Sequence, residues 1–369
     1  MDRPATITGP PAARPATGRR TTRVMIVDDS MIARTVLTRL VQAEPDFEIV
    51  AKATTGETAI ARLAEVRVDV ILLDLEMPGM GGIGALPTIL KLGAGAKVLV
   101  VSSLTAAGAE HTLAALSMGA ADTLLKPRAG EFDAEYGRTL VAKIRALASP
   151  VGARHVAGRR EFPPAAQRPA PGREFEALAI GASTGGIHAL CLMLGALPAS
   201  VDLPIFVVQH LPESFMETLA RQLAAASGRR AVVASPGTVA EAGRIHVAPG
   251  DGHMIVRREG RRLVTGIAHH AVPSGCTPSV DPLFESLAEA TGGRTLGVVL
   301  SGMGRDGVIG AAELVKAGGM IFAQDAATSA VWGMPRAVAE AGLAAAVLPP
   351  AEIAARIAGM AGAAMARRA

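Results

Sequence analysis

A repeated alternation of short apolar runs with longer amphipathic stretches limits the fold of this chain more than any other feature of its sequence. Short apolar runs bounded by loop residues are typical of buried strands, and the stretches between them are long enough for helices. Strands joined through helices form a parallel sheet that helices cover on both faces. In the first part of the chain, the predicted strands are residues 24–27, 49–53, 68–73, 98–101 and 123–125.

The alternation resumes later, with predicted strands at residues 178–180, 205–208, 231–234, 296–300 and 320–323. It is interrupted by a predicted hairpin of residues 253–257 and 261–265, which turns through Glu259 and Gly260. We therefore predict an α/β protein with an N-terminal five-stranded doubly wound parallel sheet. A second α/β domain follows, with a mainly parallel sheet and a small hairpin.

Two segments rich in Pro, Ala, Gly and Arg lie before and between these units. Such a composition buries too little apolar surface to offset the entropy lost on ordering. The predicted organisation is a disordered basic tail, a first domain, a linker, a second domain and a C-terminal tail, at residues 1–22, 23–147, 148–174, 175–363 and 364–369.

The net charge of +4 and the pI near 9.4 raise nucleic acid as a partner, so the position of the charge matters. Residues 1–22 carry a net +3 and residues 150–173 a net +4, which leaves −3 on the rest of the chain. Aromatic residues make up only 3% of the sequence. The predicted domains therefore lack the field that gathers phosphates and the rings that stack on bases, and a nucleic-acid function is disfavoured.

The only cysteines are Cys191 and Cys276, which are too few for a disulfide framework and have no metal-ligand spacing. Both are interpreted as reduced structural residues. No apolar run approaches the roughly 20 residues of a membrane span. Because the N-terminus also lacks the apolar core of a secretion signal, we expect a cytoplasmic protein without a transmembrane segment.

Polar residues follow successive strands of the first predicted sheet. Asp28 and Asp29 follow the first strand, Asp74 the third, Ser102 ends the fourth and Lys126 follows the fifth. Because the carboxyl ends of parallel strands meet at one edge of the sheet, we expect these side chains to gather there. Three carboxylates favour Mg²⁺, which can bridge a carboxylate to a phosphoryl oxygen. Asp74 would then be a nucleophile, with the hydroxyl and the ammonium placed to meet the phosphoryl charge.

Each of these aspartates alone is more simply explained as a helix N-cap or a turn residue. That explanation does not account for five polar residues at the ends of successive strands. Here the first domain resembles the receiver domain of two-component response regulators. The resemblance implies that Asp74 is the phosphoacceptor, that Asp28 and Asp29 help to hold Mg²⁺, and that Ser102 and Lys126 contact the phosphoryl group.

A glycine-rich turn with the sequence GASTGG places Ser183 at the carboxyl end of a buried strand in the second domain. Backbone N–H groups in such a turn would face a developing anion. A serine in this position is more often an N-cap than a nucleophile. A nucleophilic serine needs a base, and the base needs a group that orients it.

The chain has eight histidines and many acidic residues, and their positions relative to the predicted strands identify the candidates for the base and for the orienting group. His210 ends a neighbouring strand at the same sheet edge as Ser183, whereas His253 opens the hairpin. Two carboxylates remain as the orienting group, Asp306 in a glycine-rich loop and Asp325 after the next strand. The glycine-rich loop favours Asp306 because it lets the backbone approach a substrate closely.

Six motifs then occur together in the second domain: IGASTGG from Ile180, QH from Gln209, APGDGHM from Ala248, PSVDPLF from Pro278, SGMGRDG from Ser301 and QDAATSAVWGMP from Gln324. With this set the domain resembles the catalytic domain of the chemotaxis protein-glutamate methylesterases, the CheB family. Together with the receiver, the resemblance covers essentially the whole chain outside the N-terminal tail. It implies that Ser183 is the nucleophile, His210 the general base and Asp306 the orienting carboxylate.

The resemblance also implies substrates and partners. The expected enzyme removes methyl esters from glutamate side chains of methyl-accepting chemoreceptors, also deamidates receptor glutamines, and is activated when a chemotaxis histidine kinase phosphorylates the receiver. Mg²⁺ is expected in the receiver, and no cofactor in the catalytic domain. We expect a monomer in which the backbone N–H groups of Thr184 and Met303 stabilise the tetrahedral intermediate.

Three departures from the family and several alternatives accompany this prediction. The linker is long and Pro-rich, and Arg305 adds a cation beside Asp306 that we expect to face solvent. The family usually has a basic residue just before PSVD, where this chain has Cys276 and Thr277. The main alternative is a non-catalytic phospho-switch that binds chemoreceptors or other partners and in which Ser183 is dispensable. A transcriptional regulator would need a helix-turn-helix pattern and a basic face, and a nucleotide-phosphate loop would need a Lys-Ser/Thr pair after the turn; the sequence has neither.

Overall fold

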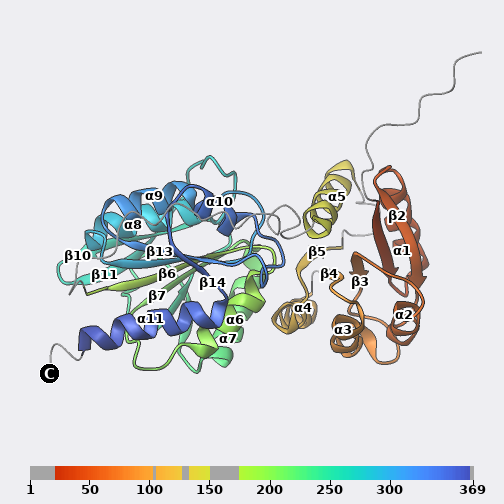
Figure 1. The fold of residues 1–369 in the computed structure, drawn as a ribbon, viewed down its shortest axis with the longest axis horizontal. Helices are drawn as coiled ribbons and strands as arrows, with labels where there is room; N and C mark the ends of the chain where they lie inside the picture. The colour runs from red at the N-terminus through yellow and green to blue at the C-terminus, as the bar shows by residue number, and fades with distance from the viewer. Residues whose placement is uncertain (1–20, 103–104, 127–132, 150–173, 366–369) are drawn as a thin grey trace, which may run out of the picture.

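The structure is a computed structural model, and it describes residues 21–102, 105–126, 133–149 and 174–365. The predicted N-terminal tail and the linker lie almost entirely outside these residues, and so do the last four residues of the predicted C-terminal tail. The described part forms two α/β units, as predicted (Figure 1).

The first unit contains a five-stranded parallel sheet in the order β2-β1-β3-β4-β5. Its three inner strands are mostly apolar and buried, as a sheet covered on both faces requires, whereas the edge strand β2 is buried only at Phe47 and Ala53. The order reverses between β1 and β3, and ligands of such sheets bind at this kind of switch point. Its elements are β1 (Thr22–Val27), α1 (Met31–Gln42), β2 (Phe47–Ala53), α2 (Gly56–Leu63), β3 (Val70–Leu73), α3 (Gly81–Leu92), β4 (Lys97–Ser102), α4 (Ala106–Met118), β5 (Asp122–Leu125) and α5 (Ala134–Ala148).

The second unit contains a seven-stranded parallel sheet in the order β14-β13-β12-β6-β7-β9-β8, with a separate antiparallel hairpin, β10-β11. Helices α8, α9 and α10 lie on one face of the sheet, and α6, α7 and α11 on the other (Figure 1). Its strands are β6 (Ala177–Ala182), β7 (Ile205–Gln209), β8 (Ala231–Val233), β9 (Ile245–Val247), β10 (His253–Glu259), β11 (Arg262–Ala268), β12 (Thr295–Val299), β13 (Met320–Gln324) and β14 (Ala344–Leu348). Its helices are α6 (Gly186–Ala196), η1 (Glu213–Phe215), α7 (Met216–Ser227), α8 (Val280–Thr291), α9 (Val308–Lys316), α10 (Met334–Glu340) and α11 (Pro350–Met365).

Two strands of the second sheet were not predicted. β9 is only three residues long and has His246 at its centre, while β14 begins with three alanines, whose intrinsic preference is for helix. Both are fixed by their neighbours: β9 lies between β7 and β8, and β14 pairs with β13. Tertiary pairing therefore decides their conformation.

The two units pack against each other through α4 and the start of β5 on one side and α6, α7 and the β6–α6 turn on the other (Figure 1). Leu116 of α4 and Ile187 of α6 belong to one buried apolar cluster that continues from the first unit into the second. At its edge, His188 Nδ1 lies 2.7 Å from the carbonyl oxygen of Ser117. Among the described helices, none is both long and apolar enough to cross a membrane.

Candidate active site

The second sheet brings three loops together at its carboxyl edge. β6 lies at the centre between β7 and β12, so the chain segments that follow these three strands leave the sheet side by side. Ser183 follows β6, His210 follows β7 and Asp306 lies in the loop after β12. The order of the strands reverses at β6, which makes this edge a switch point of the kind that binds ligands.

The Ser183 turn is held from several directions. Its N–H donates to the carbonyl of Ser301 at 3.0 Å, and Gln209 Nε2 donates to the Ser183 carbonyl at 2.9 Å. Gly185 has a φ of +77°, which a residue with a side chain rarely adopts. At Gly302, an added Cβ would lie 2.9 Å from the Cβ of Ser183, so the loop after β12 approaches the turn closely. The position of Ser183 therefore depends on glycines and on backbone contacts.

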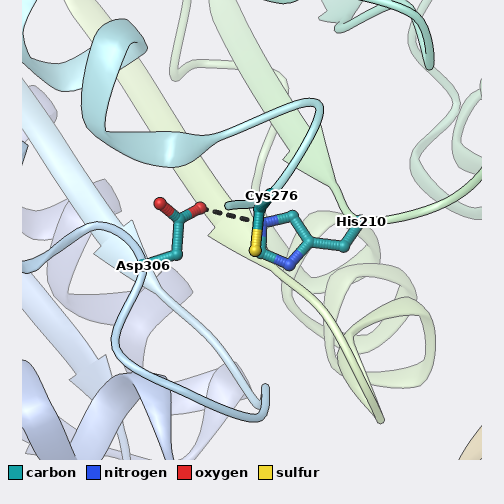
Figure 2. A group of neighbouring side chains, drawn as sticks. All are labelled: His210, Cys276 and Asp306. Atoms are coloured by element: carbon teal, nitrogen blue, oxygen red, sulfur yellow. Dashed lines mark hydrogen bonds and ion pairs between the residues drawn. The ribbon is translucent and has the colours of Figure 1, made fainter. Parts of the chain in front are cut away.

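His210 and Asp306 form a close pair. His210 Nε2 lies 2.8 Å from Asp306 Oδ2 (Figure 2). Because a carboxylate only accepts, Nε2 is the donor and Nδ1 of the neutral ring is left to accept a proton. The rival Asp325 instead caps a turn, where it accepts the N–H of Thr328 at 3.1 Å.

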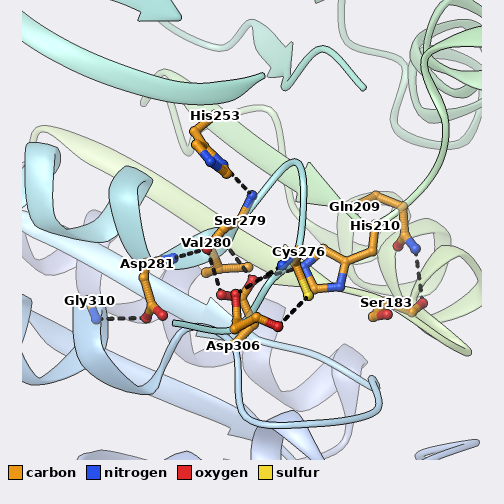
Figure 3. A network of polar contacts seen from close by, with 11 residues as sticks. Ser183, Gln209, His210, His253, Cys276, Ser279, Val280, Asp281, Asp306 and Gly310 are labelled. Atoms are coloured by element: carbon orange, nitrogen blue, oxygen red, sulfur yellow. Dashed lines mark hydrogen bonds and ion pairs between the residues drawn. The ribbon is translucent and has the colours of Figure 1, made fainter. Parts of the chain in front are cut away.

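Asp306 is 1% exposed, and its remaining hydrogen-bond capacity is used within the protein. Oδ1 accepts the hydroxyl of Ser279 at 2.6 Å, and Oδ2 accepts the N–H of Val280 at 2.7 Å. Ser279 is itself the N-cap of α8, and its N–H donates to Nδ1 of His253 at 3.1 Å (Figure 3). His253 Nε2 in turn donates to the carbonyl of His270 at 2.8 Å. His253 therefore helps to fix Ser279, which bonds the Asp306 carboxylate.

The electrostatics of the pair follow from this arrangement. Burial alone would raise the pKa of Asp306, but the bonds from His210, Ser279 and Val280 lower it to about 2. Burial lowers the pKa of His210, whereas the bond to Asp306 and the adjacent Cys276 thiol raise it, and the balance is a pKa of about 9. At neutral pH the two residues therefore form an ion pair in this conformation.

The Ser183 hydroxyl and the two N–H groups predicted to stabilise the intermediate are the remaining groups of the site. Within the described residues, the Ser183 hydroxyl makes no hydrogen bond to His210, and the N–H groups of Thr184 and Met303 donate to no other protein group. Links between nucleophile and base are often long in the absence of substrate. The backbone of Met303 lies in an exposed loop, and Arg305 beside it faces solvent.

Sequence reasoning did not assign a role to three residues of this site. Ser279 lies in the PSVDPLF motif, where a serine immediately before a helical pattern is a signal for an N-cap, but nothing in the motif indicates its bond to Asp306. His253 was set aside because it opens the hairpin. Cys276, interpreted as a reduced structural residue, lies next to the imidazole of His210 (Figure 2).

The first sheet gathers its own predicted residues. Lys126 Nζ lies 2.6 Å from Asp74 Oδ2 and 2.9 Å from Asp28 Oδ2. Burial raises the pKa of Asp74; Lys126 lowers it without cancelling the effect, and Asp28 adds to the rise. Carboxylate oxygens of Asp28, Asp29 and Asp74 lie within 4.8 Å of one another, and an all-oxygen donor set of this kind fits Mg²⁺. The buried hydroxyl of Ser102 has no hydrogen-bond partner in the described part of the chain, which fits a group that receives a ligand oxygen.

Residues of the first unit cover the Ser183 turn. The Gly185 N–H donates to the carbonyl of Ala121 at 2.6 Å, and the Thr184 hydroxyl donates to Asp122 Oδ2 at 2.7 Å. Asp122 also pairs with Lys143 of α5 at 2.6 Å. A narrow pocket between the units is lined by Leu116, Ala121 and Asp122 on one side and by Ser183, Gln209 and Leu211 on the other. The first unit therefore occupies the approach to the turn.

Comparisons with known proteins agree with these two units. Residues 24–133 match the response regulator receiver domain, and residues 178–357 match the family described as CheB methylesterase. Protein-glutamate methylesterase/protein-glutamine glutaminase 2 of Caulobacter vibrioides is 47% identical over 89% of this chain and 95% of its own. The Maricaulis maris protein-glutamate methylesterase/protein-glutamine glutaminase is 39% identical over 93% and 96%. The crystal structure of the Thermotoga maritima CheB methylesterase catalytic domain covers 51% of this chain and 99% of its own, at 33% identity and a TM-score of 0.49.

A receiver domain followed by a second α/β domain makes this chain a response regulator with an effector domain. The chain belongs to the CheB methylesterase family.

Proposed function

We propose that this chain is a phosphorylation-controlled protein-glutamate methylesterase. It removes methyl esters from glutamates of methyl-accepting chemoreceptors and deamidates receptor glutamines by the same route. The observation that carries the proposal is the pairing of half-buried His210 with buried Asp306 at the sheet edge beside the Ser183 turn. The names of the relatives supply the substrate class. Methanol release from methylated chemoreceptor membranes is the activity to measure.

In the proposed first step, Nδ1 of neutral His210 takes the proton of the Ser183 hydroxyl as its oxygen attacks the γ-carbonyl of the methylated glutamate. The negative charge that forms on the carbonyl oxygen is stabilised by the N–H groups of Thr184 and Met303. The imidazolium is stabilised by Asp306, which stays ionised because its pKa is about 2. The imidazolium then protonates the methoxide, and methanol leaves.

In the second step, water attacks the acyl-enzyme as His210 takes its proton. The same N–H groups hold the second tetrahedral intermediate, and its collapse returns the proton to Ser183 Oγ and frees the glutamate carboxylate. A glutamine side chain follows the same course, with ammonia leaving in place of methanol.

The pKa of His210 makes the reaction depend on pH. The base must be neutral, and a pKa of about 9 leaves it mostly protonated at neutral pH. We therefore expect kcat/KM to rise about tenfold for each pH unit below 9 and to level off above it. Initial rates of methanol release between pH 6 and 10 measure this. A plateau that already begins at pH 7 contradicts the ion pair as the resting state.

Control by the receiver follows from the contact between the two units. The proposal is that the unphosphorylated receiver blocks the turn through Ala121 and Asp122, and that phosphorylation loosens this contact. Asp122 begins β5 and Lys126 follows it, four residues or about 13 Å further on. A change in the bonds of Lys126 to Asp74 and Asp28 can therefore reach the interface along one short strand.

Asp74→Asn is expected to remove the response to phosphorylation. The amide cannot accept a phosphoryl group, so the ratio of methanol release with and without a small-molecule phosphodonor should fall to one, whereas the unaltered chain should be activated several-fold or more. Both rates are measured on the same preparation in the presence of Mg²⁺. A ratio that stays above one places the phosphoacceptor elsewhere.

The segment 174–369 is the matched control for this experiment, since it contains the whole second sheet and no receiver. It should release methanol faster than the unphosphorylated full chain and show no response to the phosphodonor. If the segment is slower than the unphosphorylated full chain, the receiver is not an inhibitor.

Mg²⁺ and a histidine kinase are the further partners that we propose for this chain. When bound, Mg²⁺ would be held by Asp28, Asp29 and Asp74 and would neutralise phosphoryl charge during transfer to Asp74. A chemotaxis histidine kinase is the proposed phosphoryl donor, and the enzyme is proposed to work as a monomer in the cytoplasm.

A further inference from the structure

Cys276 adds a third donor to the catalytic pair. Its thiol sulfur, an imidazole nitrogen of His210 and a carboxylate oxygen of Asp306 all lie within 4.8 Å of one another. The thiol lies beside the imidazole ring of His210, and Nε2 of the ring is hydrogen-bonded to the carboxylate of Asp306 (Figure 2). The esterase mechanism uses His210 and Asp306 and has no step for this thiol.

These three side chains are the types of ligand that Zn²⁺ takes in proteins. It binds thiolate sulfur at about 2.3 Å, imidazole nitrogen at about 2.0–2.1 Å and carboxylate oxygen at about 2.0–2.2 Å, usually in a tetrahedron. Three protein ligands leave the fourth position for water. A thiolate-containing set selects against the hard ion Mg²⁺, which the receiver needs.

The surroundings hold the ligands in place. Asp306 is oriented by Ser279 Oγ and the Val280 N–H, at 2.6 and 2.7 Å, and bonds of this kind to a ligating carboxylate strengthen metal sites (Figure 3). Cys276 is half-buried and lies in the loop between β11 and α8, so the site is open to small ions.

A thiolate and a carboxylate with a neutral imidazole carry −2, which matches the charge of Zn²⁺. The Nε2–Oδ2 distance of 2.8 Å would open by about half an ångström to admit the ion.

We propose that His210, Cys276 and Asp306 form an inhibitory Zn²⁺ site inside the active centre of the esterase. Binding releases two protons to solvent, one from the Cys276 thiol and one shared by His210 and Asp306. The ion takes the place of the proton between His210 Nε2 and Asp306 Oδ2. The single proton of the neutral imidazole then sits on Nδ1, so Nδ1 can no longer take the proton of Ser183, and ester hydrolysis stops. The inhibitory role rests on the proposed esterase function; the binding site does not.

Binding is tested without substrate on the full-length chain, freed of metal and kept in excess Mg²⁺ so that the receiver carboxylates do not take up Zn²⁺. Zn²⁺ affinity is measured by competition with a chromophoric chelator, and Co²⁺ serves as the spectroscopic probe. Cys276→Ser is the variant, and Cys191→Ser, which alters the other cysteine in α6, is its matched control.

We expect one Zn²⁺ per chain, a thiolate-to-cobalt charge-transfer band in the near ultraviolet, and the same results with Cys191→Ser. Cys276→Ser should lose the band and bind Zn²⁺ at least ten times more weakly. In the activity assay, methanol release by the unaltered chain should fall in proportion to the Zn²⁺ bound. For Cys276→Ser, compared with its own metal-free rate, half-inhibition should need at least ten times more Zn²⁺.

Two results would overturn the proposal: Zn²⁺ affinity unchanged by Cys276→Ser, or bound Co²⁺ without a thiolate band. Full methanol release from a chain with Zn²⁺ bound through Cys276 would overturn the inhibitory role. Zn²⁺ binding through Cys276 in a chain that never releases methanol, even without metal, would uphold the site and count against the esterase instead.

Discussion

Ser183→Ala is expected to reduce methanol release from methylated chemoreceptor membranes by about 10⁶-fold in kcat, the loss typical of removing a serine nucleophile that acts with a base. The change removes one oxygen from a half-buried side chain. The turn itself is held by the bond from the Ser183 N–H to the Ser301 carbonyl and by the bond from the Gln209 side-chain amide to the Ser183 carbonyl, so it should keep its conformation. Substrate binding should therefore survive, and the residual rate should reflect the N–H groups of Thr184 and Met303 alone.

The matched control for this variant is Ser200→Ala, at an exposed serine in the loop between α6 and β7. It should leave methanol release unchanged. A Ser183→Ala protein that retains more than about a tenth of the activity would mean that another group attacks the ester, and the mechanism would have to be abandoned.

Asp306→Asn has the second largest expected effect, a fall in kcat/KM of about 10⁴-fold, or roughly 5.5 kcal/mol of transition-state stabilisation. The amide nearly keeps the shape of the carboxylate, and its oxygen can still accept the N–H groups of His210 and Val280, which both donate to Oδ2. The amide carries no charge, however, so it no longer stabilises the imidazolium that forms when His210 takes the proton of Ser183. The pKa of His210 should also fall, since its main stabilising partner is lost.

Asp325→Asn provides the comparison, because Asp325 is the other carboxylate that the sequence offered and it caps a turn at Thr328. Its effect on kcat/KM should be less than about threefold. The reverse pattern, with a severe loss for Asp325→Asn and a mild one for Asp306→Asn, would exchange their roles.

Much of the fold follows from the sequence because apolar periodicity reports burial directly. Strands such as β1, β3 and β6 are buried along their whole length or nearly so, and they stand out as apolar runs. β9 and β14 could not be recognised in this way. Their few residues include a histidine or several alanines, and only the neighbouring strands make them extended.

The candidate site was predictable in part for a similar reason. The residues that follow parallel strands lie at one edge of the sheet, so strand positions placed Ser183 and His210 together but left Asp306 and Asp325 as candidate carboxylates. The glycine-rich loop and the family resemblance then favoured Asp306. Contacts that depend on how a long loop folds back could not be predicted in this way. The segment between β11 and α8 brings Cys276 against His210 and Ser279 against Asp306, and no periodic signal marks that path.

The contact between the receiver and the Ser183 turn also could not be predicted from the sequence. Asp122 lies in a strand and bonds to Thr184 across 62 positions of the chain. Its partner depends on how two separately folded surfaces pack, and apolar periodicity within each unit carries no information on that packing. The sequence could offer control by the receiver only as a hypothesis, to which the structure adds named contacts.

The central claim is that this chain is a methylesterase under receiver control. Its most direct test is methanol release from methylated chemoreceptor membranes by the purified full-length chain with Mg²⁺, with and without a small-molecule phosphodonor. We expect slow release that accelerates when the phosphodonor is added. Absence of release from several receptors, with Asp74 shown to be phosphorylated, would contradict it and would favour a non-catalytic phospho-switch.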